Sequence, residues 1–136
     1  MWITPDSANI NKTWQTLILN KYNHGLRLML NGRIRGEIYN DTLNKTEYVY
    51  SKGGAVNYDT WNHIAMKYDG QTVKLYINGS LSTSQSSIGE LGTTDTSPVY
   101  IGKFTNAQIY NGKIDEIKMY GKVLSAGEIM NSYNKI

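Results

Sequence analysis

The acidic and histidine residues of this chain do not form a recognisable catalytic set. Asp115 and Glu116 are adjacent in a strand-like stretch, so their side chains point to opposite faces and cannot act as a pair. His24 and His63 are far apart, and the sequence contains no G-x-S-x-G elbow, no H-E-x-x-H pair, no P-loop and no cysteine. We therefore expect a protein that is not an enzyme.

Calcium is the metal ion that the carboxylates of this chain could hold. Ca²⁺ takes about six to eight oxygen ligands, and Asp115 could supply one together with loop carbonyls and Asp6, Asp59 or Asp95. The alternative is that Asp115 accepts backbone hydrogen bonds at the start of its strand. The sequence leaves both explanations open.

The stretch from Trp61 to Leu81 predicts a three-strand meander. Asp69-Gly70 and Asn78-Gly79 suit two-residue hairpin turns, and strand-like alternation flanks both. A loop at Asp69-Gly70 places Met66 opposite Val73 on a shared apolar face. The other face, where a binding surface is expected first, carries Trp61, His63, Ala65 and Lys67 against Thr72, Lys74 and Tyr76.

A second hairpin is predicted around Asn31-Gly32. A two-residue loop there would put the preceding leucines and the following isoleucines on opposite faces, whereas an odd loop places Leu30 opposite Ile34 on one face. The odd loop also places Arg27 opposite Glu37 on the outer face. An opposite-charge pair across two strands is stabilising by roughly 0.2 to 1 kcal/mol.

The remaining chain continues the pattern of short strands and turn signals. About ten strands are predicted, followed by one helix in which Ser125 and Glu128 have capping-box spacing. This pattern is typical of an all-β protein with an antiparallel sandwich or jelly roll. With 136 residues and no linker-like stretch, residues 1–136 are expected to form a single domain.

Charge and hydropathy exclude some classes of binding partner. The net charge of +3 comes from 14 Lys and Arg that are spread through the chain against 11 Asp and Glu, so we expect no nucleic-acid partner. The sequence contains no apolar run long enough to span a membrane, and its first residues do not have the pattern of a signal peptide.

Three groups of motifs carry a family resemblance. They are WITPDS at residues 2–7, WNHIA, YDG and LYING between residues 61 and 79, and YIG, GKIDEIKMY and LSAGEI between residues 100 and 129. Together they resemble the laminin-G-like domains of the concanavalin A-like lectin/glucanase family over nearly the whole chain. The glucanases of that fold carry Glu-x-Asp-x-x-Glu on one strand, and no Glu here has an Asp two positions later.

The resemblance implies a carbohydrate-binding or adhesion module of an extracellular, cell-surface or viral protein. Sugar rings stack on exposed aromatic rings, and Trp14 is the first candidate because it lies in a polar loop, although a loop Trp can also fold back over the core. Trp61 is expected to pack at the start of a strand. The further candidate ligand-binding residues are Tyr22, His24, Tyr48, Tyr50, His63 and Tyr76.

Domains of this family usually have an additional stretch before the WITPDS motif, which supplies strands and often part of a calcium site. Without those strands some backbone edges stay unpaired, and unpaired edges pair readily with other chains. We therefore expect a homo-oligomer. The alternative function is a structural domain that assembles through open sheet edges without binding glycan.

Overall fold

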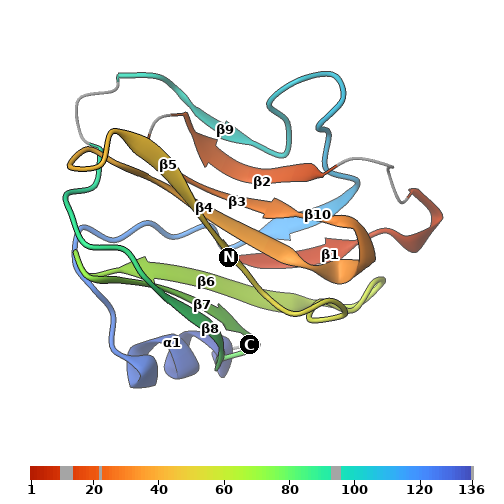
Figure 1. Cartoon of the computed structure of the whole chain (residues 1–136). Helices are drawn as coiled ribbons and strands as arrows, with labels where there is room; N and C mark the ends of the chain where they lie inside the picture. Colours follow the sequence, from red (N-terminus) through yellow and green to blue (C-terminus); the bar gives the residue numbers. More distant parts are fainter. Residues whose placement is uncertain (10–13, 22, 93–95, 136) are drawn as a thin grey trace.

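Figure 1 shows the computed structural model of the chain, in which two β-sheets pack face to face and a short helix covers the outer side of one sheet. The structure describes residues 1–9, 14–21, 23–92 and 96–135. Among these residues, no helix is long and apolar enough to cross a membrane.

Each sheet contains five strands, and every paired strand is antiparallel to its neighbour. The first sheet has the order β10 (Gly112–Asp115), β1 (Trp2–Pro5), β6 (Asn62–Tyr68), β7 (Thr72–Ile77) and β8 (Ser80–Ser86). The second has the order β5 (Lys45–Tyr50), β4 (Ile34–Asn40), β3 (His24–Leu28), β2 (Gln15–Asn20) and β9 (Val99–Ile101). Two short 3₁₀ turns span Ser7–Asn9 and Leu30–Gly32.

The core lies between the sheets because alternate side chains of each strand point inward. Its fully buried members include Ile3, Leu28, Ile34, Ile64 and Leu75, which come from strands of both sheets. The predicted fold class, an all-β antiparallel sandwich with one short C-terminal helix, is confirmed.

The predicted meander is present as β6, β7 and β8. Asn78 and Gly79 have φ angles of 50° and 78°, and Ile77 pairs with Ser80. Positive φ at both loop positions is what a type I′ turn requires. The second of the two predicted turns is therefore confirmed.

The register of β6 on β7 differs from the prediction by two residues. Met66 lies opposite Leu75 rather than Val73. The Asp69 carboxylate accepts hydrogen bonds from the backbone N–H groups two and three residues later, at 2.9 and 2.7 Å, and this moves the loop to Gly70-Gln71. A shift of two residues keeps each side chain on its predicted face.

The register of β3 on β4 also differs from the prediction by two residues. Leu28, not Leu30, lies opposite Ile34, and the loop between them is longer than expected while keeping an odd number of residues. Gly32 in this loop has a φ of 68° and accepts a hydrogen bond from the backbone N–H of Val56 at 3.0 Å. This contact with a distant segment holds the longer turn in place.

The helix α1 (Ala126–Tyr133) begins with the predicted capping box. The Glu128 backbone N–H donates to Ser125 Oγ at 3.1 Å, and the Ser125 N–H donates to the Glu128 carboxylate at 2.7 Å. Hydrogen bonds to Lys122 and to Ser125 lower the pKa of Glu128 to about 2. The helix packs beneath β6 to β8 in Figure 1 and buries Ile129.

The last strand is shorter than predicted. The motif GKIDEIKMY was expected to be one strand over residues 112–120, but β10 ends at Asp115. Glu116 has a φ of 48°, a left-handed conformation that interrupts an extended strand. Residues 116–124 then run to the helix without pairing in either sheet.

Candidate functional site

The polar face of the meander is covered at His63 and Tyr76, the two residues that the sequence predicted as ligand contacts there. His63 and Tyr76 are 3% and 4% exposed, and the rings of Trp2 and Tyr133 lie 5.1 and 6.2 Å from the His63 ring. Burial, followed by the nearby amino terminus and Lys118, lowers the pKa of His63 to about 4. Neither predicted candidate is accessible to a ligand here.

The outer face of the second sheet carries a buried cluster of charges. Arg27 on β3 lies directly opposite Arg35 on β4, and Glu37 lies two residues further along β4, on the same face. The Glu37 carboxylate accepts from Arg27 Nη2 at 3.2 Å and from Arg35 Nη2 at 2.7 Å. The predicted Arg27–Glu37 pair is thus formed, but diagonally, and a second arginine shares the carboxylate.

The partners of this cluster differ between the two arginines. Arg27 Nη1 donates to Gln108 Oε1 at 2.7 Å and to Thr16 Oγ1 at 3.3 Å. Arg35 Nε is buried without a hydrogen-bond partner among the described residues. With one carboxylate and two guanidinium groups, the cluster has a net charge of +1.

Gly25 leaves room for this carboxylate. Gly25 pairs with Glu37 across the strands, and a Cβ at Gly25 would lie 3.1 Å from both Cγ and Oε1 of Glu37 and 2.7 Å from Leu19 Cδ1. A side chain there would displace the carboxylate from the two arginines. The glycine is therefore part of what positions the charges.

Three aromatic rings lie close to two arginines, Arg35 on β4 and Arg33 directly before that strand. The Arg35 guanidinium carbon is 4.4 Å from the Trp14 ring centroid and 4.7 Å from that of Tyr48, while that of Arg33 is 4.6 Å from the Tyr50 ring. These distances are typical of cation–π contacts. We refer to Trp14, Arg33, Arg35, Tyr48 and Tyr50 as the aromatic–arginine surface.

The aromatic–arginine surface combines rigid support with exposed rings. The Trp14 and Tyr48 side chains are 37% and 42% exposed, although Arg35 between them is buried. Aromatic rings held in this way offer flat apolar surface beside polar groups. That combination suits a ligand with both apolar and hydroxyl faces.

Three predicted candidates, Trp14, Tyr48 and Tyr50, are brought together here. The arginines were not predicted as site residues, although Arg33 and Arg35 occupy alternate positions just before Glu37 and therefore share one face of the strand. The sequence signal that could have identified these arginines is the placement of charged residues at every second position of one strand, with aromatic residues on the strand that follows.

The other candidates lie elsewhere. His24 is half-buried at the start of β3, with Nδ1 2.6 Å from Asn23 Oδ1, and burial lowers its pKa. Tyr22 and Asp95 lie outside the described residues. Trp61, which was expected to pack at a strand start, is 46% exposed.

Asp115 lies apart from the other predicted calcium ligands that the structure describes, Asp6 and Asp59, which both accept hydrogen bonds from backbone N–H groups of the turn at Ser7–Asn9. Asp115 ends β10 rather than starting a strand, and its carboxylate accepts from the next backbone N–H at 2.7 Å. β1 separates it from Asp6, since Trp2 pairs with Asp115 and Pro5 at the other end pairs with Gly112. Within the described ranges, no group of three or more His, Cys, Asp or Glu could hold a metal ion.

Comparison with known proteins identifies the family. The profile of the concanavalin A-like lectin/glucanases superfamily matches residues 1–130. The chain belongs to this superfamily. The match covers all ten strands and most of α1, which agrees with the resemblance seen in the motifs. A search of curated proteins returned no match.

Solved structures share the fold of this superfamily member at low sequence identity. The carbohydrate-binding module CBM40 of the Ruminococcus gnavus IT-sialidase matches with a TM-score of 0.78 and 21% identity, over 98% of this chain and 79% of that one. Domain 4 of AbnA, an extracellular arabinanase from Geobacillus stearothermophilus solved with arabinotriose, matches with a TM-score of 0.70 and 19% identity over 96% and 62%. The receptor-binding domain of botulinum neurotoxin type G matches with a TM-score of 0.59 and 20% identity over 98% and 36%.

Proposed function

We propose that this protein is a non-catalytic carbohydrate-binding module and that its glycan binds on the aromatic–arginine surface. The observation that carries the proposal is that the buried Arg35 guanidinium contacts the rings of both Trp14 and Tyr48, at 4.4 and 4.7 Å. Both rings are fixed from within while a large part of each stays in contact with solvent.

A glycan can use such a surface in two ways. The C–H groups on one side of a sugar ring pack against an aromatic ring, and the hydroxyl groups around its edge bond to nearby polar side chains. Here Trp14 and Tyr48 supply the rings. Arg33 donates from Nε to the Ser51 carbonyl at 2.9 Å, and we propose that its terminal nitrogens bond to hydroxyl groups of the glycan.

The structural neighbours support this class of ligand. The Ruminococcus gnavus module was solved with α2,3- and α2,6-sialyllactose, and the Geobacillus domain with arabinotriose. Because the arabinanase is extracellular and the neurotoxin domain binds a receptor, we propose that the present chain serves as an attachment module of a larger extracellular, surface or virion protein.

A glycan array tests the proposal, run once with calcium and once with chelator. The array should contain sialylated and arabinose oligosaccharides together with neutral glycans. We expect binding that Trp14→Ala and Tyr48→Ala each lower at least tenfold. Trp61→Ala is the matched control, because it removes another exposed indole that lies outside the surface.

The outcomes separate the alternatives. Loss of binding in chelator would show that binding requires calcium, for which the sequence offered Asp115 as one candidate ligand. Binding that is lost in Trp61→Ala but kept in both surface variants would move the site elsewhere. A blank array in both conditions would contradict the proposal and favour the assembly domain.

A further inference from the structure

One row of residues crosses all five strands of the second sheet on its outer face. Residues that lie directly opposite each other in antiparallel strands share a face of the sheet. Glu37 on β4 pairs with Tyr48 on one side and with Gly25 on the other, and Leu19 on β2 pairs with both Gly25 and Tyr100. The row therefore runs from Tyr48 on the edge strand β5 to Tyr100 on the edge strand β9. It spans four inter-strand spacings, roughly 19 Å.

The row has an aromatic ring at each end and a low, packed middle. Tyr48 is exposed and Tyr100 is partly exposed, whereas the three residues between them are buried. Gly25 has no side chain, and Leu19 Cδ1 lies 2.7 Å from the position that a Cβ on Gly25 would take. A molecule that lies along the row would therefore cross a packed floor between two tyrosines.

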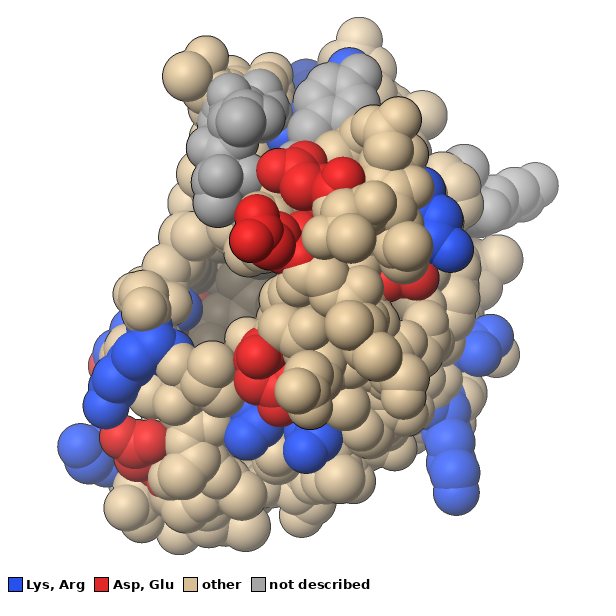
Figure 2. Space-filling model, turned by 60° about the vertical axis from the view of Figure 1, so that its left-hand side comes forward, with Lys and Arg blue, Asp and Glu red and all other residues tan. Residues whose placement is uncertain are grey.

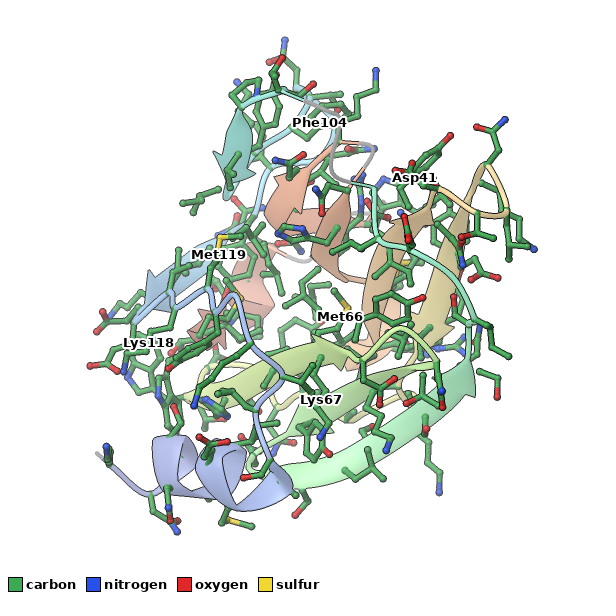
Figure 3. The ribbon with its side chains drawn as sticks, turned by 90° about the vertical axis from the view of Figure 1, so that its left-hand side faces the viewer. Asp41, Met66, Lys67, Phe104, Lys118 and Met119 are labelled. Carbon is green, nitrogen blue, oxygen red and sulfur yellow. The ribbon has the colours of Figure 1, made fainter. Side chains whose placement is uncertain are left out.

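Two further rings lie beside this row. The Arg27 guanidinium carbon is 5.8 Å from the ring centroids of both Trp14 and Phe104, within the range of cation–π contacts. The Phe104 ring lies 5.1 Å from the Tyr100 ring, nearly edge-on. Figure 3 shows Phe104 on the side of the second sheet that faces away from the first sheet. Because Trp14 belongs to the aromatic–arginine surface, the rings continue from that surface to the edge at β9.

The segment that carries Phe104 is tied to the sheet. The Thr16 backbone N–H donates to the Gln108 carbonyl at 3.2 Å, and Gln108 Oε1 accepts from Arg27 Nη1 at 2.7 Å. These contacts fix the segment after β9 to β2 and β3. Side chains that are held in place before binding lose less conformational entropy when a ligand arrives.

We propose that the ligand of this protein is the interior of a linear oligosaccharide, which lies across the strands along this row. The inference rests on the proposed glycan-binding function and specifies the kind of glycan. Tyr48 and Trp14 contact the sugar units at the β5 end, and Phe104 and Tyr100 contact those at the β9 end. A row of roughly 19 Å accommodates about four or five sugar units, whereas a single terminal sugar would use only one end of it.

The hollow between the two sheets, which Figure 2 shows, is the other place where an elongated ligand could lie. Its lining from the second sheet includes Ile18, Leu26 and Ile38, whose side chains point into the core. The row and the hollow are therefore on opposite sides of this sheet. Met119 lines the hollow and is 57% exposed, so a substitution there tests the alternative.

The test compares a short and a long probe made of the same sugar. Arabino-, xylo- and cello-oligosaccharides are each used as a disaccharide and as a pentasaccharide, and dissociation constants are measured by calorimetry. We expect the pentasaccharide of at least one series to bind at least tenfold more tightly than its disaccharide, because its additional units contact further rings of the same surface. In NMR spectra the pentasaccharide should shift the ring signals of both Tyr48 and Tyr100.

Variants at the two ends of the row separate the contributions. Phe104→Ala and Tyr100→Ala should each weaken pentasaccharide binding about fivefold or more. Both should leave the disaccharide unchanged, since it binds at Trp14 and Tyr48, and this also shows that the variants are folded. Trp14→Ala should weaken both probes. Met119→Ala is the control, because it removes another large apolar side chain, and it should change neither.

The outcomes distinguish this inference from the proposed function. Equal affinity for both lengths, or no effect of Phe104→Ala and Tyr100→Ala, would overturn the inference. Binding of array glycans at Trp14 without binding of any linear probe would also overturn it, and in each of these cases the proposed function would stand. A loss of pentasaccharide binding in Met119→Ala would place the ligand in the hollow and overturn the inference as well. Absence of binding to every probe and every array glycan would contradict the proposed function itself.

Discussion

His63 is an ionisable side chain held among aromatic rings. Its Nδ1 is buried and has no hydrogen-bond partner among the described residues. Burial lowers its pKa from the ordinary 6.5 to about 4. In the unfolded chain the imidazole binds a proton below about pH 6.5, whereas in the folded protein it stays neutral until about pH 4. The folded state therefore loses stability as the pH falls from 6.5 to 4.

This difference in the pKa of His63 predicts that the folded state is less stable in acid. We expect the free energy of unfolding to fall by about 1 to 2 kcal/mol between pH 7 and pH 4 through this residue alone, after allowing for solvent screening. Urea unfolding at several pH values measures it. His63→Gln should flatten the profile, while His24→Gln, whose parent pKa is lowered less, should change it less. A parent profile that stays level over this range would contradict the assignment.

The charged residues show what the sequence can and cannot predict at this scale. Alternation along the strands was enough to place Arg27 and Glu37 on one face and to predict their pair. It did not show that Arg35 would share the Glu37 carboxylate. That contact depends on the register of β3 on β4, and the predicted register differs from the observed one by two residues. Nor did it show that Trp14, from a distant loop, would cover them.

Among the elements, the hairpin at Asn78-Gly79 formed as predicted, whereas the β6–β7 and β3–β4 hairpins formed with the correct faces and the wrong register. In one case the Asp69 side chain bonds to the backbone ahead of it and moves the turn. In the other the turn is held by a segment more than twenty residues away, through the Gly32 carbonyl and the Val56 N–H. Hydrophobic alternation has a period of two. It therefore determines on which face of the sheet a side chain lies, but not which residue of the neighbouring strand lies opposite.

The loop between β3 and β4 allows a matched test of this account. Gly32 and Gly54 have φ angles of 68° and 69°, yet a Cβ on Gly32 would overlap the Val56 carbonyl oxygen while a Cβ on Gly54 would meet nothing within 4 Å. Gly54→Ala should cost about 1 kcal/mol, from its left-handed backbone alone. Gly32→Ala should cost about 3 kcal/mol or more, because it also breaks the contact.

Urea unfolding of the two variants measures the difference. Equal losses of stability in both variants would mean that the contact with Val56 does not hold the turn. A larger loss in Gly32→Ala would show that this hairpin depends on tertiary contact as well as on local turn chemistry, which explains why its register could not be read from the sequence.

At the scale of the whole molecule, the predicted sandwich was confirmed because strand alternation, turn residues and the capping box all agree on it. The open surfaces were harder to predict, since they depend on which segment covers which face. Tyr133 of the helix packs against Trp2 and His63 and so covers part of the face that had been expected to bind ligand. The outer face of the second sheet stays open over Tyr48.

The sheet edges determine how whole molecules can associate. β8 is an edge strand of seven residues, SLSTSQS, with no charged residue, whereas the edge strand β5 carries Lys45 and Glu47. Charges on an edge strand discourage pairing with another chain. The other two edge strands are short, because β9 (VYI) has three residues and β10 (GKID) has four, two of them charged. If the predicted homo-oligomer forms through an unpaired edge, we therefore expect β8, the longest edge strand without a charge, to be the edge that pairs.

Light scattering at increasing concentration tests this last prediction. We expect the mass to rise from 15.4 kDa toward twice that value. Ser84→Lys places a charge on the exposed part of β8 and should keep the protein monomeric, while Thr46→Lys on β5 serves as the control and should not. A mass that stays at the monomer value, or an equal effect of both substitutions, would exclude pairing through β8.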